Sequence, residues 1–356
     1  MKRKGNIRDI ILSGGVEEAS YLQIKDKIQE SNRGTVLLFS TIATVVFFLL
    51  FVVSLFVSTL APYRIIYAIG LAVTVLIWYI AKFYGGKNIR AMTIDVYLFS
   101  FVLLAVGIAL GTVLSPKEIA ATFIALLLAV PQVFTDRPWR MWVLIASSVI
   151  IFIIMTLKFK DPATVSSDIT NAIVFGLVSI ALCTYSMNNR IQRNFLEHQI
   201  RFLAENDQLT GLKNRYSYQL YLDRSSILNS SSIYCIYVDA NGLHELNNTK
   251  GHEAGDKMLQ YIASVMQHLF GKDNTYRIGG DEFVALGINK SLDEIEELVK
   301  SMKQAVESAG YNVAAGICLR EKTDTEMDSI IKDAEQAMYE DKAEYYRNSG
   351  KDRRRR

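Results

Sequence analysis

The chain has 356 residues, of which 50% are hydrophobic and 21% are charged, and its formal net charge is +3. That length allows about two domains. Residues 1–200 hold 18 Lys and Arg against 11 Asp and Glu, whereas residues 201–356 hold 21 against 25. Most apolar residues lie between 35 and 187. This distribution excludes a single soluble globular domain and predicts a membrane half followed by a water-soluble half.

The acidic balance of the second half argues against a nucleic-acid partner. The basic run Arg353–Arg356 is interpreted as a solvated tail, with a contact to anionic lipid headgroups as the alternative. The three cysteines, Cys183, Cys235 and Cys318, lie in apolar runs without CxxC spacing. We expect them to be reduced and buried, which excludes a disulfide framework and a zinc site.

Six apolar stretches approach the roughly 20 residues that a membrane-spanning helix needs. The opening Met1–Lys4 is not interpreted as a signal peptide, because about thirty mostly polar residues separate it from the first apolar stretch. The sequence therefore predicts an all-α bundle of six transmembrane helices within residues 35–188. The six stretches are 35–60, 63–84, 93–114, 118–134, 139–157 and 168–188.

Positive charges in the loops predict the orientation of these helices. One set of loops is richer in Lys and Arg than the other, and by the positive-inside rule it faces the cytoplasm with the basic N-terminal segment 1–34. Six crossings then place both termini in the cytoplasm and make the protein a multi-pass protein of the inner (plasma) membrane. The richer set holds Lys82, Lys87, Arg90, Arg137, Arg140, Arg190, Arg193 and Arg201, and the poorer set holds Arg64, Lys117, Lys158 and Lys160.

A transporter or channel is the alternative for this half. Ionisable residues inside the membrane usually mark an ion or substrate path. The six apolar cores contain almost none, and Asp95 lies near a helix end from which it can reach the interface. We therefore interpret the membrane half as an anchor and input domain, whose ligand the sequence does not name.

The linker 189–206 is predicted to continue the last membrane helix into the cytoplasm. Leu196, Ile200 and Leu203 recur at helical spacing and form one apolar stripe. The stripe packs either on the chain's own cytoplasmic domain or against a second protomer as a short coiled coil. The spacing leaves both alternatives open.

The cytoplasmic half, residues 207–350, alternates predicted strands and helices, followed by the basic tail 351–356. This pattern predicts an α/β domain whose sheet is covered on one side. Strands are predicted at 232–240, 275–278, 283–286 and 311–319, and helices at 253–270, 291–309 and 325–346.

Acidic residues and glycines fall where two of these strands end. Asp239 ends one strand, and Asp281–Glu282 belong to a hairpin that can lie beside it. Carboxylates on neighbouring strand ends suit Mg²⁺ when a nucleotide supplies the remaining oxygens. Gly279 and Gly280 remove side chains where a phosphate must approach the backbone. A plain Gly-Gly-Asp turn is the alternative for the hairpin alone.

Arg277–Phe283, with the sequence RIGGDEF, resembles the signature of GGDEF-domain diguanylate cyclases. Other segments resemble the family in the same order: the opening DQLTGLKNR from Asp207, the metal and guanine segment Asp239–Asp256, and the final helix Ala334–Lys342. The resemblance covers roughly 205–347 and nothing in the membrane half. It implies a nucleotidyl-cyclase-like α+β sandwich that condenses two GTP into cyclic di-GMP and two pyrophosphates at a homodimer interface.

The resemblance also implies roles for single residues. Asp239, the carbonyl of Ala240, Asp281 and Glu282 hold two Mg²⁺ ions (Mn²⁺ is possible), and Asp281 draws the proton from the attacking 3′-hydroxyl. Asn247 and Asp256 read the guanine edge, His252 and Gly280 line the nucleotide site, and Lys342 meets the triphosphate. Downstream receptors of cyclic di-GMP are implied as indirect partners. The candidate catalytic residues are Asp281 and His244.

Five positions depart from the family pattern, and two of them, Gly242 and Leu243, stand where the family commonly has aromatic contacts. His244 stands where the family has a Lys that steadies the phosphates, and Tyr346 stands where it has an Arg. The family's product-inhibition motif, Arg-x-x-Asp, falls on Phe270 and Asp273, so its arginine is missing. These departures keep an alternative open, a catalytically weak GGDEF domain that acts as a nucleotide-binding signalling module.

Overall fold

The computed structural model describes residues 7–85, 88–224, 232–321 and 327–348. The predicted tail 351–356, the opening Met1–Lys4 and Lys87 lie outside these residues. The chain divides into two compact units, Met1–His198 and Gln199–Arg356. The helix α7 (Pro162–Glu205) runs through the boundary as one continuous helix, as predicted for the linker.

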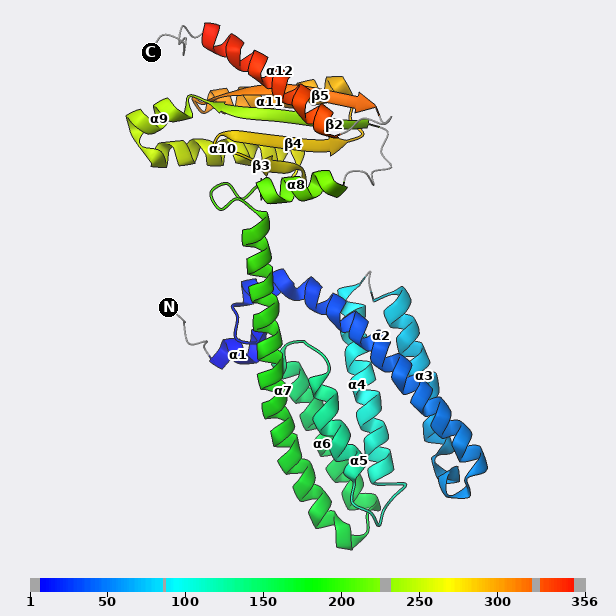
Figure 1. Cartoon of the computed structure of the whole chain (residues 1–356). Helices are drawn as coiled ribbons and strands as arrows, with labels where there is room; N and C mark the ends of the chain where they lie inside the picture. The colour runs from blue at the N-terminus through cyan, green and yellow to red at the C-terminus, as the bar shows by residue number, and fades with distance from the viewer. Residues whose placement is uncertain (1–6, 86–87, 225–231, 322–326, 349–356) are drawn as a thin grey trace. The chain divides into compact units, whose positions relative to one another are not determined.

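The first unit is all-helical, and its long helices run side by side (Figure 1). Besides α7 it holds α1 (Ile7–Ser13), α2 (Glu18–Phe56), α3 (Arg64–Phe83), α4 (Ile89–Gly111), α5 (Ala121–Ala129) and α6 (Pro138–Phe159), with short 3₁₀ helices η1 (Ser58–Tyr63) and η2 (Val130–Gln132). Among the described residues, five helical stretches are long and apolar enough to cross a membrane by length and composition: Arg8–Phe56, Ser58–Phe83, Arg90–Gly111, Pro138–Phe159 and Pro162–Glu205.

The expected spanning helix at 118–134 is shorter in the structure, where only Ala121–Gln132 is helical. Pro131 is the physical reason, because it has no N–H to donate to the carbonyl of Leu127 one turn earlier. The Ser179 hydroxyl on α7 donates to that carbonyl instead, at 2.7 Å. The thiol of Cys183 similarly donates to the Pro131 carbonyl at 3.4 Å. These two backbone carbonyls are therefore satisfied inside the protein.

Buried ionisable groups in this unit differ from the sequence interpretation. Lys160, assigned to a loop, forms an ion pair of 2.7 Å with Asp168, and both side chains are fully buried. Asp168 also accepts from the backbone N–H of Ala120 at 3.0 Å, which fixes the start of α5. Asp95 is 1% exposed and does not reach the surface. The interpretation of Lys160 as a loop residue and of Asp95 as able to reach the interface was wrong, because the sequence does not show which polar side chains the neighbouring helices bury.

The second unit is a five-stranded sheet with strand order β1-β3-β4-β2-β5 and helices around it. β1 pairs with β3 in parallel, and the other neighbours are antiparallel. The strands are β1 (Lys213–Asn214), β2 (Ser232–Asn241), β3 (Thr275–Arg277), β4 (Glu282–Ile288) and β5 (Asn312–Glu321); the helices are α8 (Arg215–Arg224), α9 (Leu243–Lys250), α10 (His252–Phe270), α11 (Leu292–Ser308) and α12 (Met327–Asn348), with a 3₁₀ turn at Lys272–Asn274.

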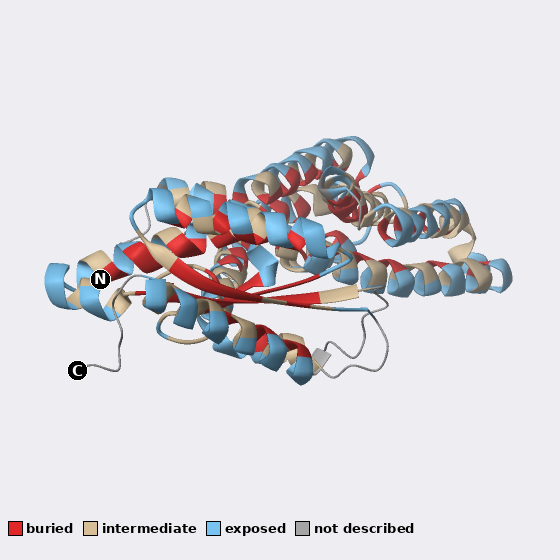
Figure 2. Ribbon diagram, turned by 90° about the horizontal axis from the view of Figure 1, so that it is seen from above, coloured by how far each residue is buried: buried red, intermediate tan, exposed pale blue. Residues whose placement is uncertain are grey.

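The sheet is covered on both faces, so the predicted one-sided cover was wrong. Ile236 and Val238 of β2 pack on one face with α10 and α11, whereas Cys235 and Tyr237 pack on the other with α12. The apolar run of β2 is continuous, which is typical of a strand with both faces covered, and it is buried over nearly its whole length (Figure 2). The α/β fold itself is confirmed.

Candidate active site

Two neighbouring strands bring the predicted acidic residues together. Asp239 near the end of β2 lies opposite Glu282 at the start of β4 in the antiparallel register. The backbone N–H of Ala240 donates to the carbonyl of Asp281 at 3.0 Å, which ties the Gly279–Asp281 turn to the end of β2. The three carboxylates therefore belong to one edge of the sheet.

The turn between β3 and β4 is shaped by its glycines. A Cβ on Gly279 would collide with the Glu282 carboxylate, so any side chain there would displace this acid. A Cβ on Gly280 would meet no atom within 4 Å. Arg277 donates to the carbonyl of Gly280 at 2.7 Å, and this hydrogen bond stabilises the turn. Gly280 thus leaves open space beside the acids, where a phosphate can reach the backbone.

Lys342 reaches this edge from α12. Its ammonium lies 2.7 Å from the carboxylate of Asp239, which is 4% exposed. Burial raises the pKa of Asp239, the Lys342 charge lowers it, and the neighbouring charges of Asp281 and Glu282 raise it further. The net direction is upward, and burial is the largest cause.

Asp341, the residue before Lys342, fixes the position of α12. Its carboxylate contacts the ammonium of Lys303 on α11 at 2.7 Å and accepts from the backbone N–H of Ala315 on β5 at 2.8 Å. Gly316 lets α12 lie directly on β5, because a Cβ there would collide with the backbone of Ala334 and Met338. These contacts hold Lys342 toward the acidic edge.

The acidic edge, formed by Asp239, Asp281 and Glu282, offers the oxygen ligands that a divalent cation prefers. Asp239 and Glu282 face each other across the β2–β4 pair, and a hard cation would stabilise such neighbouring carboxylates. Within the described ranges, no group of three His, Cys, Asp or Glu side chains is arranged to hold a metal ion by itself. The carbonyl of Ala240 and the phosphates of a nucleotide would have to complete the coordination.

A second group of predicted site residues lies on α9 and α10. The side-chain oxygen of Asn247 is buried without a hydrogen-bond partner, and it lies so close to α10 that a Cβ on Gly255 would collide with it. His252 begins α10, Asp256 follows one turn later, and both are exposed. His244 is exposed on α9, with its ring nitrogen 3.2 Å from the Asn248 amide. An unpaired acceptor beside an exposed carboxylate suits a ligand that carries several N–H donors.

Sequence reasoning missed two features of the site. Asp207 accepts three hydrogen bonds, from the N–H and hydroxyl of Thr210 at 2.9 and 2.7 Å and from Arg277 at 2.9 Å. Asn241 is 5% exposed at the end of β2, and both of its side-chain polar atoms lack a partner. Asp207 was recognised as part of a motif, but no local signal joins it to Arg277 across 70 positions.

Comparison with known proteins assigns this unit to a family. Residues 204–348 match the profile described as "Diguanylate cyclase, GGDEF domain". The response regulator PleD of Caulobacter vibrioides is 30% identical over 128 residues, which cover 35% of this chain and 28% of PleD. The cyclic di-GMP phosphodiesterase PdeR of Escherichia coli is 26% identical over 153 residues, which cover 40% of this chain and 23% of PdeR. The C-terminal unit is therefore a GGDEF domain with homologues in cyclic di-GMP signalling.

Solved structures also match part of the chain. The coiled coil and GGDEF domain of DgcB from Caulobacter crescentus, solved in complex with c-di-GMP, is 23% identical with a TM-score of 0.42, and the match covers 47% of this chain and 94% of that one. The chain spans 21%, 23% and 53% of the length of the first three curated relatives it matches.

Proposed function

We propose that the protein is a membrane-bound diguanylate cyclase that condenses two GTP molecules into cyclic di-GMP and two pyrophosphates. The observation that carries the proposal is the acidic edge, where Asp239 and Glu282 lie opposite each other beside the open turn at Gly280. Relatives with a GGDEF domain include proteins named as phosphodiesterases, so the family alone does not decide the activity. The complete acid set of this chain supports synthesis.

Each site residue has a proposed role in that reaction. Asp239, Asp281, Glu282 and the carbonyl of Ala240 would hold Mg²⁺, which supplies charge stabilisation to the attacking and leaving oxygens. Asp281 would accept the proton of the 3′-hydroxyl. Lys342 would move from Asp239 to the triphosphate, where it acts as a compact positive charge.

Base recognition is proposed for the α9–α10 group. The carboxylate of Asp256 and the unpaired oxygen of Asn247 are acceptors that match the N1–H and amino donors of guanine. Adenine presents an acceptor at N1, which would leave a carboxylate unpaired. We therefore propose GTP over ATP as the substrate, with His252 lining the same pocket.

Two GTP molecules must meet head to head, so we propose that the active species is a homodimer. Leu196, Ile200 and Leu203 of α7 are 55%, 66% and 54% exposed. We propose that this apolar stripe pairs with that of a second protomer as a short coiled coil.

Membrane anchoring by six crossings is part of the proposal. Five long apolar helices support it, and the short segment at 120–133 contacts α7 at Asp168, Ser179 and Arg190. These α7 positions extend over 22 residues, or about 33 Å at 1.5 Å per residue, close to the thickness of a bilayer core. The GGDEF domain and both termini would then lie in the cytoplasm, as the loop charges predict.

The decisive experiment is synthesis by the purified full-length protein with labelled GTP and Mg²⁺. We expect cyclic di-GMP from the unmodified protein and from Glu297→Ala, which removes an exposed acid on α11. Asp281→Ala and Asp239→Asn should lower the rate by about 10²-fold or more, because each removes a metal-binding charge. Activity that rises per molecule with concentration would support the dimer.

A weak signalling domain is the second candidate, favoured by the exposed imidazole of His244 at the usual lysine position. This candidate predicts GTP binding without cyclic di-GMP formation. Isothermal titration with GTP beside the synthesis assay separates the two functions, because only the cyclase turns over.

A further inference from the structure

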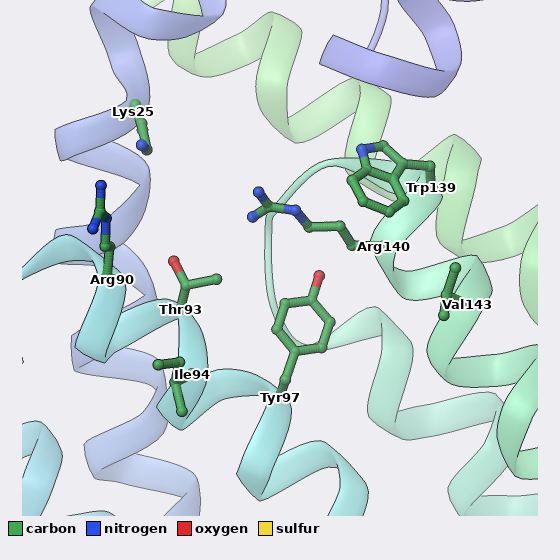
Figure 3. Close-up of a pocket in the computed structure, with 8 residues that line it drawn as sticks. All are labelled: Lys25, Arg90, Thr93, Ile94, Tyr97, Trp139, Arg140 and Val143. Atoms are coloured by element: carbon green, nitrogen blue, oxygen red, sulfur yellow. The ribbon is translucent and has the colours of Figure 1, made fainter.

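A cavity of about 550 Å³ lies between α2, α4 and α6 in the first unit, and none of its lining residues is assigned to the GGDEF site. Its cationic walls are Lys25 of α2, Arg90 of α4 and Arg140 of α6 (Figure 3). The apolar side of the lining includes Trp139, Ile94 and Val143. Three cations from three helices surround one space.

Charge in this cavity is only partly compensated. Asp136 accepts from Arg140 at 3.1 Å and from the Tyr97 hydroxyl at 2.9 Å, so one carboxylate offsets one guanidinium. Among the described residues, Lys25 and Arg90 form no ion pair with the protein. Figure 3 shows the Arg140 side chain extending across the cavity toward Lys25 and Arg90. A phosphate in this cavity would therefore meet two cations without an acidic partner in the described part of the chain, Lys25 and Arg90, and a third, Arg140, that is already paired with Asp136.

The remaining walls are apolar and open. Ile94 and Val143 are 67% and 60% exposed on helices that are apolar enough to cross a membrane. Trp139 is 39% exposed at the start of α6, and Trp is typical of the level of lipid headgroups. A ligand that fits both walls has an anionic head and an apolar tail.

We propose that this cavity binds the phosphate of an anionic glycerophospholipid, whose acyl chain lies along Ile94 and Val143. Basic pockets between membrane helices on the cytoplasmic side are suited to anionic headgroups. The inference rests on the proposed membrane embedding of α2, α4 and α6. The lipid would be a ligand of the first unit, separate from the nucleotide that the GGDEF domain binds in the proposed function.

The test uses tryptophan quenching in the full-length protein reconstituted in lipid nanodiscs. A Trp78→Phe/Trp142→Phe background leaves Trp139 as the fluorophore, because the chain has three Trp residues. Brominated phosphatidylglycerol should quench Trp139 at a mole fraction at least about fivefold lower than brominated phosphatidylcholine does, as two lipid-facing cations imply. The added substitutions Lys25→Gln/Arg90→Gln should bring the two lipids to equal effect.

The matched control, Lys82→Gln/Arg193→Gln, removes two exposed cations that do not line the cavity and should keep the preference. Equal quenching by both lipids in the parent, or a preference that survives in Lys25→Gln/Arg90→Gln, would overturn the proposal. Glycerol 3-phosphate at millimolar concentration should not relieve the quenching; relief would assign the site to a soluble phosphate compound and overturn the lipid assignment.

Membrane embedding is tested separately by quenching of the fluorescence of Trp78 on α3, in a Trp139→Phe/Trp142→Phe background. Brominated phosphatidylcholine should quench this residue if α3 lies in the bilayer. Its failure to do so would contradict the proposed anchoring and the lipid site together, whereas quenching of Trp78 without lipid preference at Trp139 contradicts only the lipid site.

Discussion

The guanidinium of Arg277 lies 2.9 Å from the carboxylate of Asp207 and joins residues 70 positions apart. Asp207 directly follows the isolated bridge residue Asn206 at the end of α7, and Arg277 also donates to Gly280 in the turn between β3 and β4. One side chain thus connects the segment that leaves α7 with the turn beside the acidic edge.

The first prediction concerns the stability of this connection. Burial raises the pKa of Asp207, but the hydrogen bonds from Thr210 and Arg277 lower it more, so the net direction is downward. A carboxyl with a lowered folded-state pKa stabilises the fold above its unfolded pKa of about 4, and this stabilisation is lost as the pH falls through the folded value. Asp207→Asn should therefore lower the free energy of unfolding at pH 7 by about 1–2 kcal/mol.

Urea unfolding of the fragment 199–356 at pH 7 and pH 3 measures this effect. The difference between the parent and Asp207→Asn should narrow at pH 3, because the parent carboxyl is then partly protonated. Asp293→Asn, at an exposed acid in the first turn of α11, serves as the control. An unchanged difference at the two pH values would contradict the role of the charged form.

The second prediction concerns the open space at Gly280. A Cβ there meets no protein atom within 4 Å, and the residue does not have a positive φ. Gly280→Ala should leave the melting temperature unchanged but lower cyclic di-GMP synthesis by roughly 10-fold or more, since a misplaced substrate costs that much in rate. Gly34→Ala, where a Cβ also meets no atom within 4 Å, is the matched control. Full activity of Gly280→Ala would show that the substrate does not approach this turn.

Whether a contact in this site can be predicted from the sequence depends on how far apart its two residues lie along the chain. The hairpin and the strand ending in Asp239 are local patterns, and the structure places them side by side in the β2–β4 register. The ion pair between Lys342 and Asp239 depends on how α12 packs on β5, which no local pattern encodes. Its geometry follows from Gly316 and Asp341, whose packing roles became visible only in the fold.

The first unit shows the same limit. Hydropathy located the long helices, but it extended the fourth span over 118–134, because it does not register that Pro131 frees a carbonyl. Likewise, Lys160 was assigned to a loop by its position between apolar runs, whereas a partner on the next helix buries it. A hydropathy value is an average over many residues. It does not detect the end of a helix at Pro131 or the burial of Lys160, because each of these depends on single hydrogen-bonding groups.

The third prediction concerns His244, which is exposed on α9. A lysine there would place a compact ammonium charge beside the phosphates at pH 8. His244→Lys should raise the rate of cyclic di-GMP synthesis several-fold at pH 8, with the larger gain at subsaturating GTP. His268→Lys places the same charge at an exposed position near the end of α10 and should have no effect. Equal effects of the two variants would attribute the gain to overall charge and not to the site.

The last prediction concerns product feedback at Phe270, which is the final residue of α10 and 5% exposed. It packs in the cluster that includes Met266 and Phe283, so its role is in the core. An arginine at the equivalent family position can hydrogen-bond the product with its planar fork, which Phe cannot do. Cyclic di-GMP added to the unmodified protein should therefore not inhibit synthesis through this position, although Asp273 is present and exposed.

Phe270→Arg tests whether the site can be restored. Placing a guanidinium in this cluster should lower the free energy of unfolding by several kcal/mol, because a charge is buried without a partner. Phe270→Leu keeps the position apolar and should retain both stability and the absence of feedback. The measurement is the initial rate of synthesis against added cyclic di-GMP for all three proteins, with thermal melting in parallel. Strong inhibition of the unmodified protein at low micromolar product would show that another site performs the feedback.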